Sequence, residues 1–171
     1  MKETLFVEGI GPVEVSFSER GSGTNVLLLH GGGGVGSVTP WAELLAATKD
    51  ARVITPTHPG LGRTPRPDTL TSVRGLALVY AAFIEKRGLH GVSVIGHSIG
   101  GWITAELGLV AGARISSLVL VDAVGLEVTD HPAEDVFAGT PANTGARVLK
   151  MYAGTMMDPS LALLTTASAC R

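Results

Sequence analysis

The chain has 171 residues, of which 45% are hydrophobic and 16% are charged, and its formal net charge is −2 at pH 7. A chain of this length and composition is expected to form one folded domain with a sizeable core. The near-neutral charge, without any run of lysine or arginine, excludes a surface built to bind nucleic acid.

Two further features indicate where the protein works. The first residues contain no apolar leader segment, and the longest apolar helical stretch, residues 76–84, is too short to cross a bilayer. Cys170 is the only cysteine, so no internal disulfide can form. Because disulfides are rare in reducing compartments, we expect a soluble, cytoplasmic protein that does not contact membranes.

Apolar runs alternate with helix-forming segments along the chain. Residues 4–7 and 13–17 flank a turn of glycine and proline, which predicts an antiparallel hairpin at a sheet edge. Continuous apolar runs predict strands buried on both faces at 26–29, 51–55, 92–95 and 115–121. Helical spacing of apolar residues predicts helices at 40–48, 68–86 and about 101–110. This alternation predicts an α/β fold with a mostly parallel, doubly wound sheet.

The pattern changes after residue 122. Residues 1–122 are predicted to form the core of the domain. In residues 123–171 the helical signals are weak and are interrupted by glycine and proline. This stretch is therefore expected to be a partial, cap-like helical segment over the sheet edge, followed by a tail.

The pentapeptide Gly-His-Ser-Ile-Gly at 96–100 lies between a predicted strand and a predicted helix. A sharp strand-to-helix turn forces its apex, Ser98, into strained backbone angles, and the two glycines allow the strand and helix to approach. This context predicts a nucleophile elbow with Ser98 as the nucleophile. The alternative is a glycine-rich turn whose serine only caps the helix.

Three other features fall at the carboxyl ends of predicted strands. They are the glycine run that follows residue 29, the loop that contains His58, and Asp122. In a parallel α/β sheet the ligand site lies along this edge. The convergence of four features at one edge predicts the site there.

These residues make the chain resemble the α/β-hydrolase superfamily, in particular its single-domain bacterial members with a helical cap. The matching motifs are the glycine run at 30–34, Thr-His-Pro-Gly-Leu-Gly-Arg at 57–63, Gly-His-Ser-Ile-Gly-Gly at 96–101 and Leu-Val-Leu-Val-Asp at 118–122. The resemblance implies hydrolysis of an ester or related acyl bond in a small molecule, with no cofactor. A serine at position 98 argues against haloalkane dehalogenases and epoxide hydrolases, which use a carboxylate nucleophile in a similar fold.

By the same resemblance, backbone amides stabilise the oxyanion. One is that of Ile99, directly after the nucleophile, and the other is that of Gly32 or Gly33. The alternative for the glycine run is a phosphate-binding loop, although it lacks the Gly-Lys-Ser/Thr ending of a P-loop.

Three histidines, His30, His58 and His97, are assigned to the surroundings of the substrate pocket. The resemblance implies that His30 orients the oxyanion loop, that His58 shapes its own loop, and that His97 points away from the nucleophile. Their spacing matches no metal-binding pattern such as H-E-x-x-H, so we expect no metal.

The chain departs from the superfamily after Ser98, where the triad order should continue with an acid and then a histidine. The only later histidine is His131, a few residues past Asp122. Asp122 is either a substitute acid or a strand-end residue that bonds loop amides. The alternatives are a C-terminally incomplete form with weak or no activity, βα units supplied by another chain, an atypical Asp122–His131 site, or a non-catalytic binding protein.

An incomplete sheet has a further expected consequence. A missing last strand would uncover a parallel sheet edge, and uncovered edges pair with other chains. We therefore expect a homo-oligomer or a complementing chain at this edge.

Overall fold

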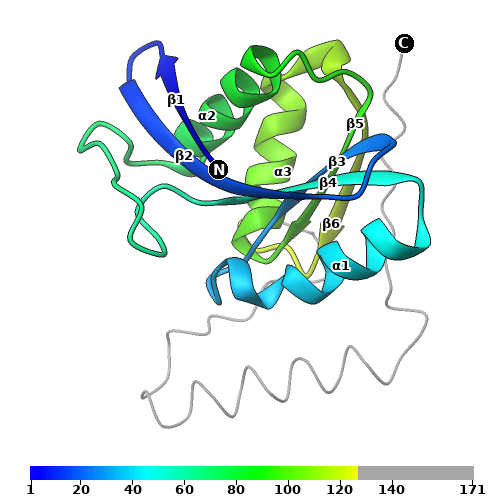
Figure 1. The fold of residues 1–171 in the computed structure, drawn as a ribbon. Coiled ribbons are helices and arrows are strands. Elements are labelled where there is room, and N and C mark those ends of the chain that lie inside the picture. The colour runs from blue at the N-terminus through cyan, green and yellow to red at the C-terminus, as the bar shows by residue number, and fades with distance from the viewer. Residues whose placement is uncertain (127–171) are drawn as a thin grey trace, which may run out of the picture. The chain divides into compact units, whose positions relative to one another are not determined.

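The computed structural model describes residues 1–126 (Figure 1). Its strands are β1 (Lys2–Val7), β2 (Gly11–Arg20), β3 (Thr24–Leu29), β4 (Ala51–Thr57), β5 (Val92–His97) and β6 (Ile115–Val121). Its helices are α1 (Thr39–Thr48), α2 (Val73–Lys86) and α3 (Ile99–Val110), with short 3₁₀ turns η1 (Val35–Ser37) and η2 (Gly112–Arg114).

The described strands form one six-stranded sheet in the order β1-β2-β4-β3-β5-β6. β2 runs antiparallel to both β1 and β4, whereas β4, β3, β5 and β6 are parallel to one another. The predicted mostly parallel α/β sheet with a hairpin at one edge is confirmed. The chain leaves β3 first toward β4 and then returns to β5 on its other side, so the crevice for a ligand lies at the carboxyl ends of these strands.

β2 is longer than the sequence indicated. The predicted strands end at residue 17 and begin again at residue 26, but β2 continues to Arg20 and β3 already begins at Thr24. The last five residues of β2 pair with β4, from Ser16 opposite Thr57 to Arg20 opposite Val53. These cross-strand contacts stabilise an extended conformation that the local sequence does not predict.

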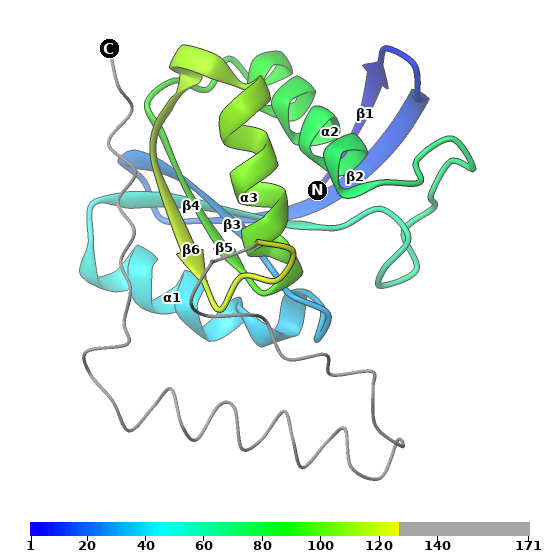
Figure 2. The same cartoon turned by 180° about the vertical axis from the view of Figure 1, so that it is seen from behind.

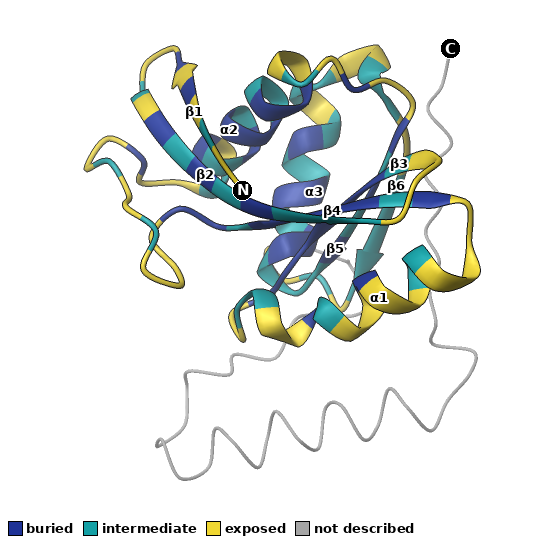
Figure 3. Cartoon of the chain, viewed as in Figure 1, coloured by how far each residue is buried: buried dark blue, intermediate teal, exposed yellow. Residues whose placement is uncertain are grey.

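The side chains of β3 alternate between two cores. Leu27 and Leu29 are buried in the core that contains α2 and α3, while Val26 and Leu28 are buried in the core that contains α1. Figures 1 and 2 show α1 on one face of the sheet and α2 and α3 on the other. Figure 3 shows the central strands in the buried colour. This double burial explains the continuous apolar runs that predicted the parallel strands.

α2 begins at Val73, five residues later than the sequence indicated. Ser72 holds the N-cap position in an extended conformation, and its hydroxyl accepts a hydrogen bond from the Gly75 N–H at 3.0 Å. Within residues 1–126, no helix is long and apolar enough to cross a membrane.

β6 is the outer strand of the described sheet and pairs only with β5 there. The prediction that residues 115–121 are buried on both faces is wrong in the described structure: Ser116 and Ser117 are exposed and the other five residues are only half-buried, because this strand has one strand neighbour there. The expected pairing of this edge with a second copy or a complementing chain stays a prediction.

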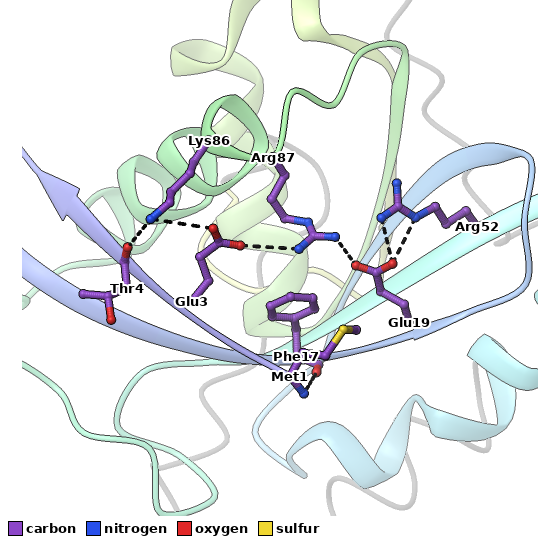
Figure 4. A network of polar contacts seen from close by, with 8 residues as sticks. All are labelled: Met1, Glu3, Thr4, Phe17, Glu19, Arg52, Lys86 and Arg87. Carbon is purple, nitrogen blue, oxygen red and sulfur yellow. Dashed lines mark hydrogen bonds and ion pairs between the residues drawn. The ribbon is translucent and has the colours of Figure 1, made fainter.

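Arg87, the C-cap residue of α2, connects the helix to the N-terminal hairpin (Figure 4). Its guanidinium forms ion pairs with Glu3 on β1 and Glu19 on β2, and it lies over the ring of Phe17 at 4.6 Å from the centroid. Glu19 also accepts a hydrogen bond from Arg52 on β4 at 2.7 Å. One cluster therefore joins three strands and a helix.

Replacing Arg87 with methionine is expected to lower the free energy of unfolding by about 2 kcal/mol, because two poorly exposed carboxylates lose their cation. Urea titration followed by circular dichroism measures the change. The control is Arg74→Met, whose arginine pairs with Glu106 but is 60% exposed, so its loss should cost less than about 0.5 kcal/mol. An equal loss in the free energy of unfolding for the two variants would contradict the stabilising role of the Arg87 ion pairs.

Candidate active site

Ser98 stands at the turn between β5 and α3. Its backbone angles are φ 55° and ψ −119°, which non-glycine residues rarely adopt, so the predicted strain is confirmed. Although Ser98 is the N-cap residue of α3, its side chain makes no capping hydrogen bond. The alternative in which the serine only caps the helix is therefore wrong. Its N–H donates to the carbonyl of Val121 at 2.9 Å, which fastens the turn to the end of β6.

The glycines around Ser98 allow the strand and helix to meet. A Cβ on Gly96 would collide with the carbonyl of Gly100 and the hydroxyl of Thr104. A Cβ on Gly100 would lie 2.6 Å from the carbonyl oxygen of His30. Both positions thus require glycine because backbone atoms occupy the space of a side chain.

Three backbone amides of the site have no hydrogen-bond acceptor among residues 1–126: those of Gly32, Gly33 and Ile99. Ile99 is the first residue of α3, where amides have no acceptor within the helix. The glycine run lies against the turn, because a Cβ on Gly31 would come 3.0 Å from the Cβ of Ser98. The site therefore offers N–H donors to an anionic oxygen near the serine.

A buried hydrogen-bonded chain lies next to the glycine run. The rings of His30 and His58 are 0% and 2% exposed, and their centroids are 3.9 Å apart. His30 Nδ1 bonds the Gly31 carbonyl at 2.7 Å, and His30 Nε2 accepts from the His58 N–H at 3.1 Å. His58 Nε2 bonds the His30 carbonyl at 2.8 Å, and His58 Nδ1 bonds the Tyr80 hydroxyl at 2.5 Å.

Burial keeps the three side chains of this hydrogen-bonded series neutral. Burial lowers the pKa of His58 to about 3, with repulsion from His30 acting in the same direction. Burial also lowers the pKa of His30 and raises that of Tyr80. Because every ring nitrogen of His30 and His58 already has a partner, neither histidine is available as the base for Ser98.

His97, directly before Ser98, packs against two neighbours. Its ring meets Trp41 of α1 edge to face, with centroids 5.8 Å apart. A Cβ on Gly31 would come 2.9 Å from His97 Nδ1, so the ring also contacts the glycine run. His97 thus helps to pack the glycine run between α1 and the elbow.

A cavity of about 400 Å³ opens beside the elbow. Ile99 and Ile103 of α3 line it, and so does the loop that begins at His58. Arg66 is the only lysine, arginine, aspartate or glutamate among its lining residues within the described part. His30 and His97 are not among those lining residues. A mostly apolar cavity of this size suits a small molecule.

The predicted acid and base are not brought together in the described part. Asp122 follows β6 with φ 46°, and its side chain is exposed and forms no hydrogen bond or ion pair within residues 1–126. His131 lies outside the described residues. Both assignments stay predictions. Across residues 1–126 no group of three or more histidine, cysteine, aspartate or glutamate residues could hold a metal ion.

Tyr80 is the residue that sequence reasoning missed. Its place on the apolar face of α2 predicted a core residue, and the side chain is fully buried. A buried tyrosine needs a partner for its hydroxyl, which was the available signal. The sequence could not show that this partner is His58, 22 residues away.

Comparison with known proteins agrees with this geometry. Residues 26–168 match the model of the Alpha/beta hydrolase family. Over 113 residues the chain is 37% identical to a putative carbamate hydrolase, RutD, of Azorhizobium caulinodans, covering 66% of this chain and 42% of the relative. Over 136 residues it is 32% identical to the 2-hydroxy-6-oxo-6-(2'-aminophenyl)hexa-2,4-dienoic acid hydrolase of Metapseudomonas resinovorans, covering 75% and 47%. The chain therefore spans less than half the length of these curated relatives.

Solved structures share the fold. An esterase of Exiguobacterium antarcticum superposes with a TM-score of 0.69 at 20% identity, covering 92% of this chain and 61% of the esterase. An esterase of Thermogutta terrifontis superposes with a TM-score of 0.67 at 18% identity, covering 98% and 67%. At these identities the likeness concerns the fold alone.

Proposed function

Because the chain belongs to the alpha/beta hydrolase family, we propose that it is a serine hydrolase that cleaves an ester or related acyl bond of a small molecule. The observation that carries the proposal is the strained Ser98 at a strand-to-helix turn, beside backbone amides that lack an acceptor within the described part. An apolar cavity adjoining Ile99 supports a small-molecule substrate.

The proposed reaction has two steps. Ser98 Oγ attacks the acyl carbon, a C–O bond forms, and the carbonyl electron pair moves to oxygen. The amides of Ile99 and of Gly32 or Gly33 donate to this oxyanion, and each such donor contributes about 3–4 kcal/mol. The bond to the leaving alcohol then breaks, and the alcohol takes up the proton that Ser98 lost. Water attacks the acyl-serine in the second step and releases the acid.

The proton of Ser98 needs a base. His30 and His58 are excluded as the base by their hydrogen bonds. His131 is the only histidine of the sequence after Ser98 and is our candidate, with Asp122 as its candidate acid. A binding protein without turnover is the second candidate function, favoured because His30 and His58, beside the glycine run, both use their ring nitrogens for other partners.

Labelling with a fluorophosphonate tests the proposal, because this reagent bonds only to an activated serine. The full chain is expected to gain one adduct by intact mass, and peptide mapping is expected to locate it on Ser98. The Ser98→Ala variant should gain none. The matched control is Ser37→Ala, which removes an exposed serine close to the glycine run and should leave labelling unchanged.

Other outcomes separate the two functions. An adduct on a different serine, or no adduct on the full chain, would overturn the serine hydrolase. A binding protein would instead show a higher Tm in the presence of an ester that it does not cleave. No adduct would form, and Ser98→Ala would leave the rise in Tm unchanged.

A further inference from the structure

The buried chain of hydrogen bonds has one direction. His58 Nε2 bonds a carbonyl, so it carries a proton, and His58 Nδ1 is then an acceptor for the Tyr80 O–H. His30 Nε2 accepts from an amide, so the proton of this ring is on Nδ1 and is donated to the Gly31 carbonyl. The two neutral rings are therefore opposite tautomers, each fixed by its partners.

The last hydrogen bond of this series reaches the Gly31–Gly32 peptide, whose N–H is a proposed oxyanion donor. The Gly31 carbonyl and the Gly32 N–H belong to one planar peptide and point in opposite directions. The carbonyl accepts two hydrogen bonds, from His30 Nδ1 at 2.7 Å and from the Gly34 N–H at 3.1 Å. Fixing the carbonyl therefore fixes the direction of the Gly32 N–H. Donation to the carbonyl also polarises the peptide and makes its N–H a stronger donor.

The three elements involved come from different parts of the fold. His30 follows β3, His58 follows β4, and Tyr80 lies in the middle of α2. Tyr80 is the first member of this series of hydrogen bonds. Packing alone does not explain a tyrosine there, because phenylalanine would fill the same space without a buried hydroxyl. Its hydroxyl donates to His58 Nδ1 and so supports the tautomer that the His30 carbonyl selects.

We propose that Tyr80 and His58 are positioning residues, which act through His30 to aim and polarise the Gly32 amide toward the oxyanion. This inference rests on the proposed serine hydrolase function. Neither residue acts on the substrate itself. The loop after β4 and helix α2 thereby contribute to transition-state stabilisation through the backbone of another loop.

Tyr80→Phe tests this proposal in the full chain. Without the hydroxyl, His58 loses one of the two partners that fix its tautomer and ring position, and the Gly32 amide is less well aimed. We expect kcat for a 4-nitrophenyl ester to fall about tenfold, with KM changed less than about twofold, because the lost interaction exists mainly in the transition state. Affinity for a boronic acid that mimics the tetrahedral intermediate should fall by the same factor.

The matched control is Phe83→Leu. Phe83 lies on the same helix and in the same core as Tyr80, and it is fully buried, but it contacts neither histidine through a hydrogen bond. This variant should lower stability and leave kcat unchanged. An unchanged kcat in Tyr80→Phe, with Ser98-dependent turnover intact, would overturn the positioning role while the hydrolase function stands.

A second measurement does not depend on turnover. In ¹H–¹⁵N NMR spectra, Tyr80→Phe is expected to shift the Gly32 amide proton upfield and to change the ¹⁵N shifts of the His58 ring, whereas Phe83→Leu should do neither. Absence of turnover and of a Ser98 adduct in the wild-type chain would reject the hydrolase, and NMR would still decide the coupling. A Gly32 resonance that is unchanged in Tyr80→Phe would overturn the proposal.

Discussion

Replacing Gly100 with alanine is expected to lower the free energy of unfolding by about 3 kcal/mol or more and Tm by about 10 °C. The added Cβ would collide with the backbone carbonyls of Leu29, the last residue of the central strand β3, and of His30, which follows it. Relief requires a shift of α3 relative to β3, which would also displace Ser98. Thermal melts followed by circular dichroism measure the loss.

The control for this prediction is Gly36→Ala. No heavy atom lies within 4 Å of the position that its Cβ would take, and the residue is exposed. Its replacement should change the free energy of unfolding by less than about 0.5 kcal/mol. If Gly100→Ala has the same Tm as the Gly36→Ala control, the space around Gly100 accommodates a Cβ and the prediction is wrong.

Acidification from pH 7 to pH 5 is expected to cost about 2 kcal/mol of stability through His58 alone. In the unfolded chain this histidine titrates with a pKa near 6.5, whereas in the folded protein burial lowers its pKa to about 3. Unfolding therefore takes up a proton throughout this range. The stability from neutral His58 is fully present above the unfolded pKa and is lost as the pH falls. The lowered pKa of His30 acts in the same direction.

Urea titrations at a series of pH values test this dependence. His58→Asn should be less stable at pH 7, and its stability should fall less steeply with acid because one proton uptake is gone. His90→Gln removes an exposed histidine and should keep the wild-type slope. An unaltered slope in His58→Asn would mean that the acid sensitivity arises elsewhere.

The sequence predicted the central strands β3 and β4 well because they are buried on both faces. Residues 115–121 are apolar enough that the predicted bounds coincide with those of β6. The glycine run and Ser98 were placed at one sheet edge, and the structure brings Gly31 against Ser98 there. Hydrophobic periodicity and turn residues are local features, so they can be identified in a single sequence.

The features that escaped prediction depend on contacts between distant residues. β2 was cut short because its last residues are held by pairing with β4, as Arg20 opposite Val53 illustrates. The start of α2 was misplaced because several residues before Val73 could serve as caps, and Ser72 is the one that does. The Tyr80–His58 bond joins two separate predicted elements, and no local pattern announces such a partner.

The bond between the Ser98 N–H and the Val121 carbonyl has a consequence for heat inactivation. The strained angles of Ser98 cost about 1–3 kcal/mol and persist only while neighbouring backbone holds them. Part of that hold is the end of β6, which has a single strand neighbour in the described sheet. Local opening at the end of β6 on warming would thus release Ser98 from its strained angles, and we expect a loss of serine reactivity that precedes global unfolding.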